Sequence, residues 1–251
     1  MRRTHRPRTT PRTYAPTAIR TPTHDTAILF FSHRPARAWQ NKWFVRNDRA
    51  KTQSVADALY RHTLQAGRAS GLPVLEVTDA QQRGSDFGTR LANAFADAFA
   101  AGYAHVIAVG SDCPRLHEVD WDAVTGQLER GAPVLGPTAD GHGAYLIGLS
   151  HAQFRRDTFA GLPWQSPDLL GALTQHLRRA AGSPHLLAAR RDVNTPADLA
   201  ALLAAPAPGL AALVRWLRCI LGAAAAVPFI STIRLSGRPR TFRSRGPPVQ
   251  A

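Results

Sequence analysis

Short apolar runs that alternate with segments of helical periodicity constrain this chain most strongly. The strand-like runs lie at 27–31, 72–77, 106–109, 133–136 and 144–149, and the helical segments at 54–66, 88–101, 121–130, 151–159 and 168–180. This order of strands and helices is typical of a mostly parallel sheet with right-handed crossovers. We therefore predict an α/β fold with a mostly parallel, Rossmann-like sheet flanked by helices. The chain has no glycine-rich dinucleotide fingerprint, which argues against a classical NAD enzyme.

The net charge of +14 lies almost entirely at the two ends of the chain. Residues 1–26 hold six arginines and one aspartate, residues 206–251 hold seven arginines and no acidic residue, and residues 27–205 contribute only +2. Since the excess charge is outside the central segment, we expect no specific nucleic-acid groove there. We predict a disordered Arg/Pro/Thr-rich extension at 1–26, a folded domain at 27–205, and an apolar helix with a basic disordered tail at 206–251.

The ends also bear on localisation. The apolar stretch at 219–233 has 15 residues, fewer than the roughly 20 that span a bilayer. Arg215 and Arg218 suit an interfacial helix on anionic lipid, but we favour a helix packed on the domain over membrane contact by the C-terminal tail. The N-terminal segment lacks the apolar region of a secretory signal, and the two cysteines have no metal or disulfide spacing. We expect a cytoplasmic protein.

Asp112 follows the apolar run 106–109 directly after Gly110 and Ser111. Such a run is typical of a strand buried on both faces, and Pro114 stops the chain from continuing regularly. In open α/β sheets ligands bind at the carboxyl ends of the strands. A carboxylate at this place suits a hard divalent cation that is held against a diphosphate. The alternative is that Asp112 only caps the following turn.

Five motifs occur in one order along the chain. They are Gln82-Arg83-Gly84-Ser85-Asp86-Phe87-Gly88-Thr89-Arg90-Leu91, Gly110-Ser111-Asp112-Cys113-Pro114, Leu135-Gly136-Pro137 with Asp140-Gly141 and Tyr145-Leu146-Ile147-Gly148-Leu149, Leu162-Pro163-Trp164, and Asp192-Val193-Asn194-Thr195-Pro196-Ala197-Asp198-Leu199. Together they resemble a bacterial domain family known as radical-SAM/selenodomain-associated transferase 1, which is related to GT-A glycosyltransferases. The resemblance covers about residues 27–203 and implies a GT-A-like transferase domain at 27–205 with the nucleotide-diphospho-sugar transferase fold. It implies no specific substrate.

The resemblance implies a site for Mg²⁺ or Mn²⁺ with Asp112 as first ligand and Asn194 or Asp192 as second. The family often has a second carboxylate where this chain has Asn194, and an amide oxygen brings less charge to a cation. We expect the last strand to end at Asp192-Val193-Asn194-Thr195. Thr195 and Pro196 then predict the start of a helix, with Thr195 as N-cap. The alternative is that Asp192 and Asp198 are only capping groups.

The resemblance also implies residues for the nucleotide and the sugar. The nucleotide-binding candidates are Lys42 as the phosphate lysine, Arg34, and four residues of the motif at 82–91, which are Gly84, Asp86, Gly88 and Arg90. The loop after the first strand lacks the glycine that the family has there. The sugar or acceptor loop is expected at Gly136, Pro137, Gly141 and Tyr145. Asp140 is a second catalytic candidate, because its carboxylate accepts hydrogen bonds from hydroxyls.

Three functions fit these residues. The first is a metal-assisted transferase with a nucleotide-sugar donor and a small-molecule or glycan acceptor. The second is a nucleotidyltransferase that joins a nucleoside triphosphate to a phosphorylated small molecule. The third is a degenerate, non-catalytic binding module held by its Arg-rich ends, for which Asn194 and the glycine-free first loop argue. We rank glycosyl transfer first.

Overall fold

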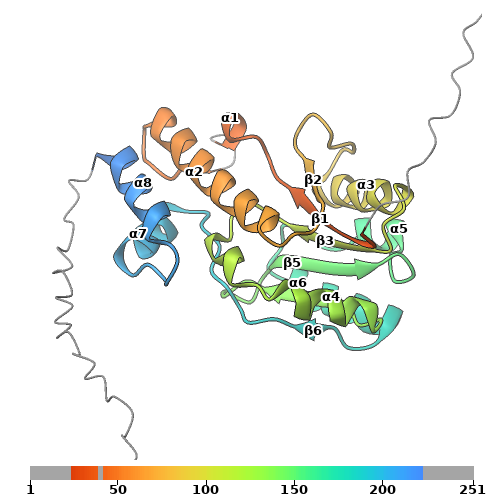
Figure 1. Cartoon of the computed structure of the whole chain (residues 1–251). Coiled ribbons are helices and arrows are strands. Elements are labelled where there is room, and N and C mark those ends of the chain that lie inside the picture. Colours follow the sequence, from red (N-terminus) through yellow and green to blue (C-terminus); the bar gives the residue numbers. More distant parts are fainter. Residues whose placement is uncertain (1–23, 39–41, 223–251) are drawn as a thin grey trace, which may run out of the picture.

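Six strands form one sheet in the order β2-β1-β3-β5-β4-β6 (Figure 1). In this computed structural model, which describes residues 24–38 and 42–222, they are β1 Thr26–Phe31, β2 Val74–Val77, β3 His105–Val109, β4 Val134–Pro137, β5 Ala144–Ser150 and β6 His185–Leu186. β1 pairs in parallel with β2 and β3, and β4 pairs in parallel with β6. β5 is antiparallel to both β3 and β4. The predicted mostly parallel sheet is confirmed, with one strand reversed.

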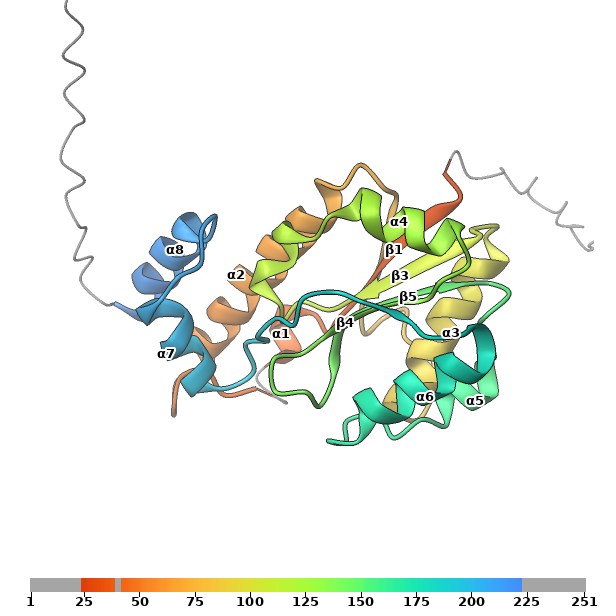
Figure 2. The same ribbon diagram turned by 90° about the horizontal axis from the view of Figure 1, so that it is seen from below.

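Helices cover both faces of the sheet (Figure 2). The helices of the described residues are α1 Pro35–Ala38, α2 Arg49–Arg68, α3 Phe87–Ala100, the 3-10 helix η1 Pro114–Glu118, α4 Trp121–Glu129, α5 Arg156–Ala160, α6 Leu169–Ala181, α7 Pro196–Ala204 and α8 Ala211–Leu221. Successive β1 residues point to opposite faces, so that Leu29 and Phe31 join the cluster under α3, α5 and α6, whereas Ile28 and Phe30 join the cluster under α2 and α4. All six β1 residues are buried, as expected of a central strand.

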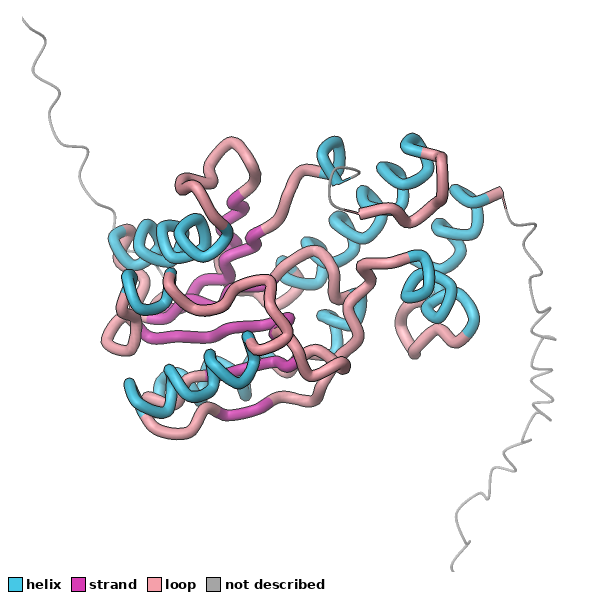
Figure 3. Tube along the Cα trace, turned by 180° about the vertical axis from the view of Figure 1, so that it is seen from behind, coloured by secondary structure: helices cyan, strands magenta, loops and turns pink. Residues whose placement is uncertain are grey.

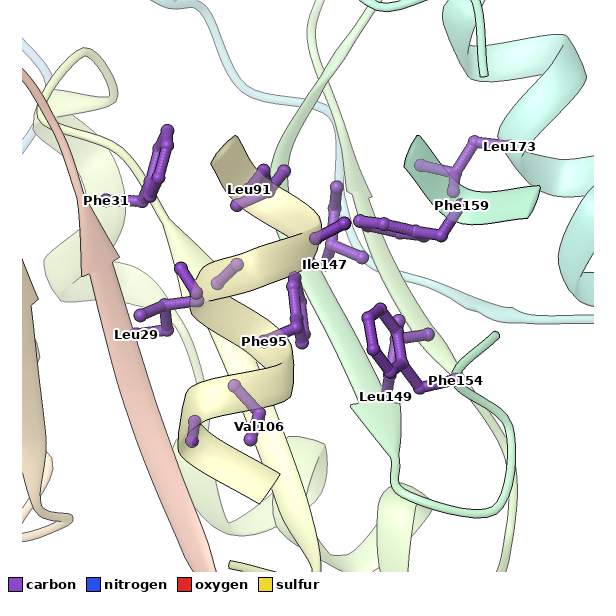
Figure 4. Packing of buried hydrophobic residues seen from close by; sticks show 14 of the residues in the cluster. Leu29, Phe31, Leu91, Phe95, Val106, Ile147, Leu149, Phe154, Phe159 and Leu173 are labelled. Carbon is purple, nitrogen blue, oxygen red and sulfur yellow. The ribbon is translucent and has the colours of Figure 1, made fainter. Parts of the chain in front are cut away.

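Phe95 of α3 lies at the centre of the first cluster (Figure 4). Its ring lies 5.6 Å from the ring of Phe154 and 5.3 Å from that of Phe159. Leu91, Phe95 and Phe99 recur at helical spacing and are all buried. This apolar stripe fixes α3 against the sheet, and with it the loop that precedes the helix.

A third cluster joins the C-terminal helices to α2. Leu213, Val214 and Leu217 of α8 pack with Val55 and Leu59 of α2 and with Leu199 of α7. Figure 3 shows α7 and α8 beside one end of α2, away from the strands. The helix that we expected within 206–251 therefore packs on α2. Residues 1–23 and 223–251 lie outside the described residues, and with them most of the predicted extension and the basic tail.

Three expected elements differ from the structure. The helix expected at 151–159 begins only at Arg156, because a turn in which Gln153 N donates to Ser150 O comes first. The helix expected at 54–66 begins at Arg49, since Asp48 caps it by accepting from Lys51 N at 2.8 Å. The strand expected to end at Asp192 is wrong: β6 has two residues, and beyond it Arg190 makes a single bridge to Thr138. Among the described helices, none is long and apolar enough to span a membrane.

Candidate active site

A cavity of about 320 Å³ opens at the carboxyl ends of β1 and β3. Because β5 alone runs the other way, the carboxyl ends of the remaining strands share this edge of the sheet. The apolar lining includes Phe31, Phe44, Phe87, Leu91, Ile147, Trp164 and Leu169, and the polar lining includes Ser32, His33, Lys42, Gln82, Ser111, Asp112, Thr138 and Asp192. The predicted place of the site, outside the strand ends, is where the structure has its cavity.

Asp112 is held in the cavity by neighbours from three segments. Its Oδ1 forms an ion pair with the ammonium of Lys42 and accepts a hydrogen bond from Ser111 Oγ at 3.0 Å. Its backbone oxygen accepts from Val193 N at 2.7 Å. This last bond draws the chain after β6 to the end of β3 and places Asp192 in the cavity lining.

Asp192 lacks the partners that Asp112 has. Its Oδ1 is buried and has no hydrogen-bond partner. Burial first, and then the negative charge of Asp112, raise the pKa of Asp192 to about 7, whereas Lys42 acts in the opposite direction. An unpartnered buried carboxylate is costly, and two facing carboxylates are the oxygen ligands that Mg²⁺ and Mn²⁺ prefer. The two aspartates therefore fit a divalent cation, although the described residues contain no cluster of three or more His, Cys, Asp or Glu ligands.

Asn194 does not lie with these aspartates. It is exposed and is absent from the described cavity lining. The backbone N–H groups of Asn194 and Thr195 donate to Asp198 Oδ2 at 3.2 and 3.0 Å. Thr195 and Asp198 form a capping box at the start of α7, as the sequence predicted for Thr195. Asp198 is thus a capping group, and of the two candidates for the second ligand only Asp192 faces the cavity.

Of the nucleotide-binding candidates, only Lys42 lines the cavity among the described residues. Arg34 lies on a separate groove, where its Nε donates to Thr78 Oγ1 at 3.3 Å. The motif at 82–91 contributes Gln82, Phe87 and Leu91 to the lining, whereas its predicted residues Gly84, Asp86, Gly88 and Arg90 lie outside it.

Three of those four residues, Asp86, Gly88 and Gly84, have a structural role around α3. Asp86 caps α3 by accepting from Thr89 N at 2.8 Å, and this bond lowers the pKa of Asp86. Gly88 lies so close to Ala160 and Trp164 that a Cβ atom there would be 2.2 Å from the carbonyl oxygen of Ala160. Gly84 has a φ of +139°, which favours glycine. Arg90 Nε is buried without a hydrogen-bond partner.

In the predicted sugar loop, Tyr145 lines the cavity and the other candidates position it. A Cβ atom on Gly136 would lie 2.5 Å from the Tyr145 ring, so only glycine fits there. Pro137 ends β4, and Gly141 takes a φ of +75° in the turn that follows. The phenol of Tyr145 donates to Ala188 O at 3.2 Å.

Asp140 lies at the tip of that turn. Thr138 Oγ1 donates to its Oδ1 at 2.6 Å and His142 N donates at 3.0 Å, and these bonds lower the pKa of Asp140. Its side chain is 65% exposed and is absent from the described lining. The structure therefore brings Lys42, Asp112, Asp192 and Tyr145 into one cavity and leaves Asp140 outside.

His33 and Asp79 form a pair that the sequence analysis did not predict. His33 lines the cavity, and its Nδ1 is hydrogen-bonded to Asp79 Oδ1. The two residues follow β1 and β2, which are adjacent in the sheet. They lie 46 positions apart in the chain, and neither belongs to a motif with a known spacing. Only the pairing of the two strands could have indicated the contact.

Comparisons with known proteins identify the family and the fold. Residues 31–166 match the model of a family described as an uncharacterized protein conserved in bacteria (DUF2064). A search of the curated proteins finds no match. Among solved structures, a "putative nucleotide-diphospho-sugar transferase" from Desulfovibrio desulfuricans G20 is 23% identical, with a TM-score of 0.67 over 80% of this chain and 99% of that one. This similarity shows that the fold is that of the nucleotide-diphospho-sugar transferases.

Two further solved structures are less similar. One is a homologue of Mycobacterium tuberculosis rv0371c from Mycobacterium sp. strain JC1, with 16% identity and a TM-score of 0.42 over 76% of this chain and 98% of that one. The other is CMP:2-keto-3-deoxy-manno-octonic acid synthetase complexed with CTP, with 15% identity and a TM-score of 0.37 over 70% of this chain and 96% of that one. At these scores neither structure carries an argument about this chain.

Proposed function

This chain belongs to the DUF2064 family of uncharacterised bacterial proteins, and on that premise we propose that it is a metal-assisted transferase with a nucleotide-sugar donor. One observation carries the proposal. Lys42, Asp112 and Asp192 meet in one cavity at the carboxyl ends of the strands, where ligands bind in open α/β sheets. The acceptor is a small molecule or a glycan.

Asp112 and Asp192 would hold Mg²⁺ or Mn²⁺ through their carboxylate oxygens. The bound cation would neutralise the charge that develops on the leaving diphosphate. Lys42 carries the nearby positive charge that suits a phosphate. Lys42 already lies within ion-pair distance of Asp112. The fold therefore holds the residues for the cation and for the diphosphate next to one another.

The size and the lining of the cavity support a bound organic ligand. Its volume of about 320 Å³ falls within the roughly 300 to 1,000 Å³ that is usual for ligand pockets. Phe44, Phe87 and Trp164 offer aromatic surface, on which a planar base can stack. Asp112 stands just beyond the end of β3, and rigid elements of that kind position reacting groups precisely.

Thermal denaturation of the full chain tests the proposal. Nucleoside diphosphates, nucleoside triphosphates and nucleotide sugars are added in separate arms, with and without Mg²⁺ or Mn²⁺. A ligand at 100 times its Kd stabilises a protein by about 2.7 kcal/mol. We expect metal-dependent stabilisation by a nucleotide sugar, and its loss in Asp112→Ala.

The control variant is Asp157→Ala, since that side chain is 91% exposed and its ion pair is with the adjacent Arg156. It should respond as the unchanged protein does. Stabilisation by a triphosphate and not by a nucleotide sugar would instead indicate nucleotidyl transfer. Stabilisation by no nucleotide in any arm would contradict the proposal.

A further inference from the structure

The loops that follow β1 and β2 are joined by hydrogen bonds that fix His33 at the cavity. Ser32 N donates to Val77 O at 3.2 Å, and Gln82 Nε2 donates to Ser32 O at 3.1 Å. Arg34 N donates to Asp79 Oδ2 at 2.8 Å. Residues on both sides of His33 are therefore tied to the loop that carries Asp79.

Both oxygens of the Asp79 carboxylate are used in this arrangement. Oδ2 accepts from the Arg34 backbone, and Oδ1 is bonded to His33 Nδ1. Burial of Asp79 acts against ionisation, but the bonds from His33 and Arg34 outweigh it and lower the pKa of Asp79. A carboxylate accepts only, so Nδ1 carries the hydrogen of a neutral ring and Nε2 is left as the proton acceptor.

The His33 ring lies in the same cavity as the candidate metal and phosphate residues. A hydrogen-bond chain connects the two places: Ser32 Oγ donates to Ser111 Oγ at 2.8 Å, and Ser111 Oγ donates to Asp112 Oδ1 at 3.0 Å. The side chain of His33 is 42% exposed, whereas that of Asp79 is 14% exposed. A ligand can thus reach the imidazole, and the orienting carboxylate is held behind it.

We propose that His33 is a catalytic residue whose Nε2 takes the proton from a hydroxyl group of the acceptor, and that Asp79 is its positioning residue. This inference rests on the proposed function. In the step, the acceptor oxygen forms a bond to the anomeric carbon of the donor sugar while the bond from that carbon to the diphosphate oxygen breaks. The electron pair of the broken bond leaves with the nucleoside diphosphate, and the hydroxyl proton moves to Nε2.

The inference names the class of acceptor. A hydroxyl group must lose its proton when its oxygen bonds to the transferred sugar. A general base that takes this proton speeds the reaction by about 10²- to 10⁴-fold. A phosphate acceptor is already ionised near neutral pH and needs no base. A carboxylate-backed imidazole in the cavity therefore favours an alcohol or sugar hydroxyl over a phosphorylated acceptor.

The first experiment reads the tautomer of His33 and needs no substrate. Long-range ¹H–¹⁵N NMR spectra of the full chain with labelled histidine are recorded at a pH where the ring is neutral, and the His33 signals are assigned by their loss in His33→Gln. We expect the Nδ1–H tautomer, and a change toward Nε2–H in Asp79→Leu, which keeps the size of the side chain and removes the acceptor. An Nε2–H tautomer in the unchanged protein would overturn the inference, whatever the outcome of the nucleotide tests.

The second experiment separates binding from transfer. Release of nucleoside diphosphate from the best-stabilising nucleotide sugar is followed with water as acceptor. We expect His33→Gln to keep the metal-dependent thermal stabilisation and to lower the rate by about 10²-fold or more.

His185→Gln is the matched control, because His185 is exposed on β6. It should leave the rate as it is. A His33→Gln rate within threefold of the unchanged protein would overturn the inference, and so would loss of donor stabilisation in that variant, which would make His33 a donor-binding residue. Failure of every nucleotide to stabilise the unchanged protein would count against the proposed function and leave the tautomer result to decide the role of His33.

Discussion

The ammonium of Lys42 forms an ion pair with Oδ1 of Asp112 inside the cavity. The pair joins the segment after α1 to the loop after β3. The positive charge of Lys42 also opposes the rise in the pKa of the neighbouring Asp192. Lys42 therefore balances part of the negative charge of the two aspartates. A divalent cation and a diphosphate would share this arrangement, with the cation on the aspartates and the phosphate oxygens on Lys42.

Lys42→Met should change metal binding and nucleotide binding in opposite directions. Mn²⁺ alone should bind more tightly, because a positive charge beside the aspartates is removed. A nucleoside diphosphate with Mn²⁺ should bind about tenfold or more weakly, since one charge-assisted hydrogen bond is worth about 1.5 to 3 kcal/mol. Titration calorimetry measures both, with Lys51→Met as control, because the Lys51 side chain is 44% exposed and lies outside the cavity lining. Equal weakening of metal and nucleotide would contradict the role of Lys42 as the phosphate residue.

Glu118 should govern part of the acid denaturation. Hydrogen bonding to Arg115 first, and to Arg190 as well, lowers the pKa of Glu118 from 4.5 to about 2. A carboxyl with a depressed pKa stabilises the folded state above its unfolded pKa, and this contribution disappears as the pH falls from about 4.5 to about 2. Glu118→Gln should reduce the free energy of unfolding at pH 7 and flatten its decline over that range, as measured by urea denaturation. An unchanged decline would show that other carboxylates control acid stability.

Gly88→Ala should destabilise the fold rather than act through nucleotide affinity alone. The new Cβ atom would meet the carbonyl oxygen of Ala160 at 2.2 Å and the Trp164 ring at 2.3 Å, and overpacking of this kind costs about 1 to 3 kcal/mol. Gly171→Ala is the control, because nothing lies within 4 Å of its Cβ position in α6 and alanine favours a helix by about 1 kcal/mol. Thermal denaturation should move in opposite directions for the two variants. A Gly88→Ala protein of normal stability with lost nucleotide binding would restore the predicted binding role.

Leu217→Ala tests whether α8 is part of the fold. Leu217 is fully buried in the cluster that α8 shares with α2, and truncating a buried leucine costs about 2 to 5 kcal/mol. Cys219→Ser on the exposed side of the same helix should change the stability by less than about 0.5 kcal/mol. Urea denaturation of the full chain distinguishes them. Equal stability of both variants would show that α8 contributes nothing to the folded domain.

The sequence predicted those features that a short local pattern identifies. Asp112 was found because a buried apolar run stops just before it, and the Thr195 cap because Pro196 follows it at the start of the helix. The antiparallel direction of β5 was not predicted, since periodicity identifies a strand but not its direction. The shortness of β6 was missed for a similar reason, because pairing with β4 decides where it ends.

Contacts between distant segments explain the remaining differences. The choice of Asp192 over Asn194 depends on the bond from Val193 N to Asp112 O, which no local pattern encodes. The motif at 82–91 predicts nucleotide binding, whereas in the structure Gly88 makes room for Ala160 of α5 and for Trp164 in the loop after α5. His33 and Asp79 meet because β1 and β2 pair in register.

Electron paramagnetic resonance of Mn²⁺ with the full chain tests the central claim most directly, since the signal of free Mn²⁺ falls as the ion is bound. Mn²⁺ is titrated with and without a nucleoside diphosphate into the unchanged protein, Asp112→Ala, Asp192→Asn and the control Asp157→Ala. The account predicts binding that the nucleotide strengthens in the unchanged and control proteins, and its loss in both cavity variants while each remains folded. Mn²⁺ binding in Asp112→Ala equal to that of the unchanged protein, or no binding in the unchanged protein with nucleotide present, would contradict it.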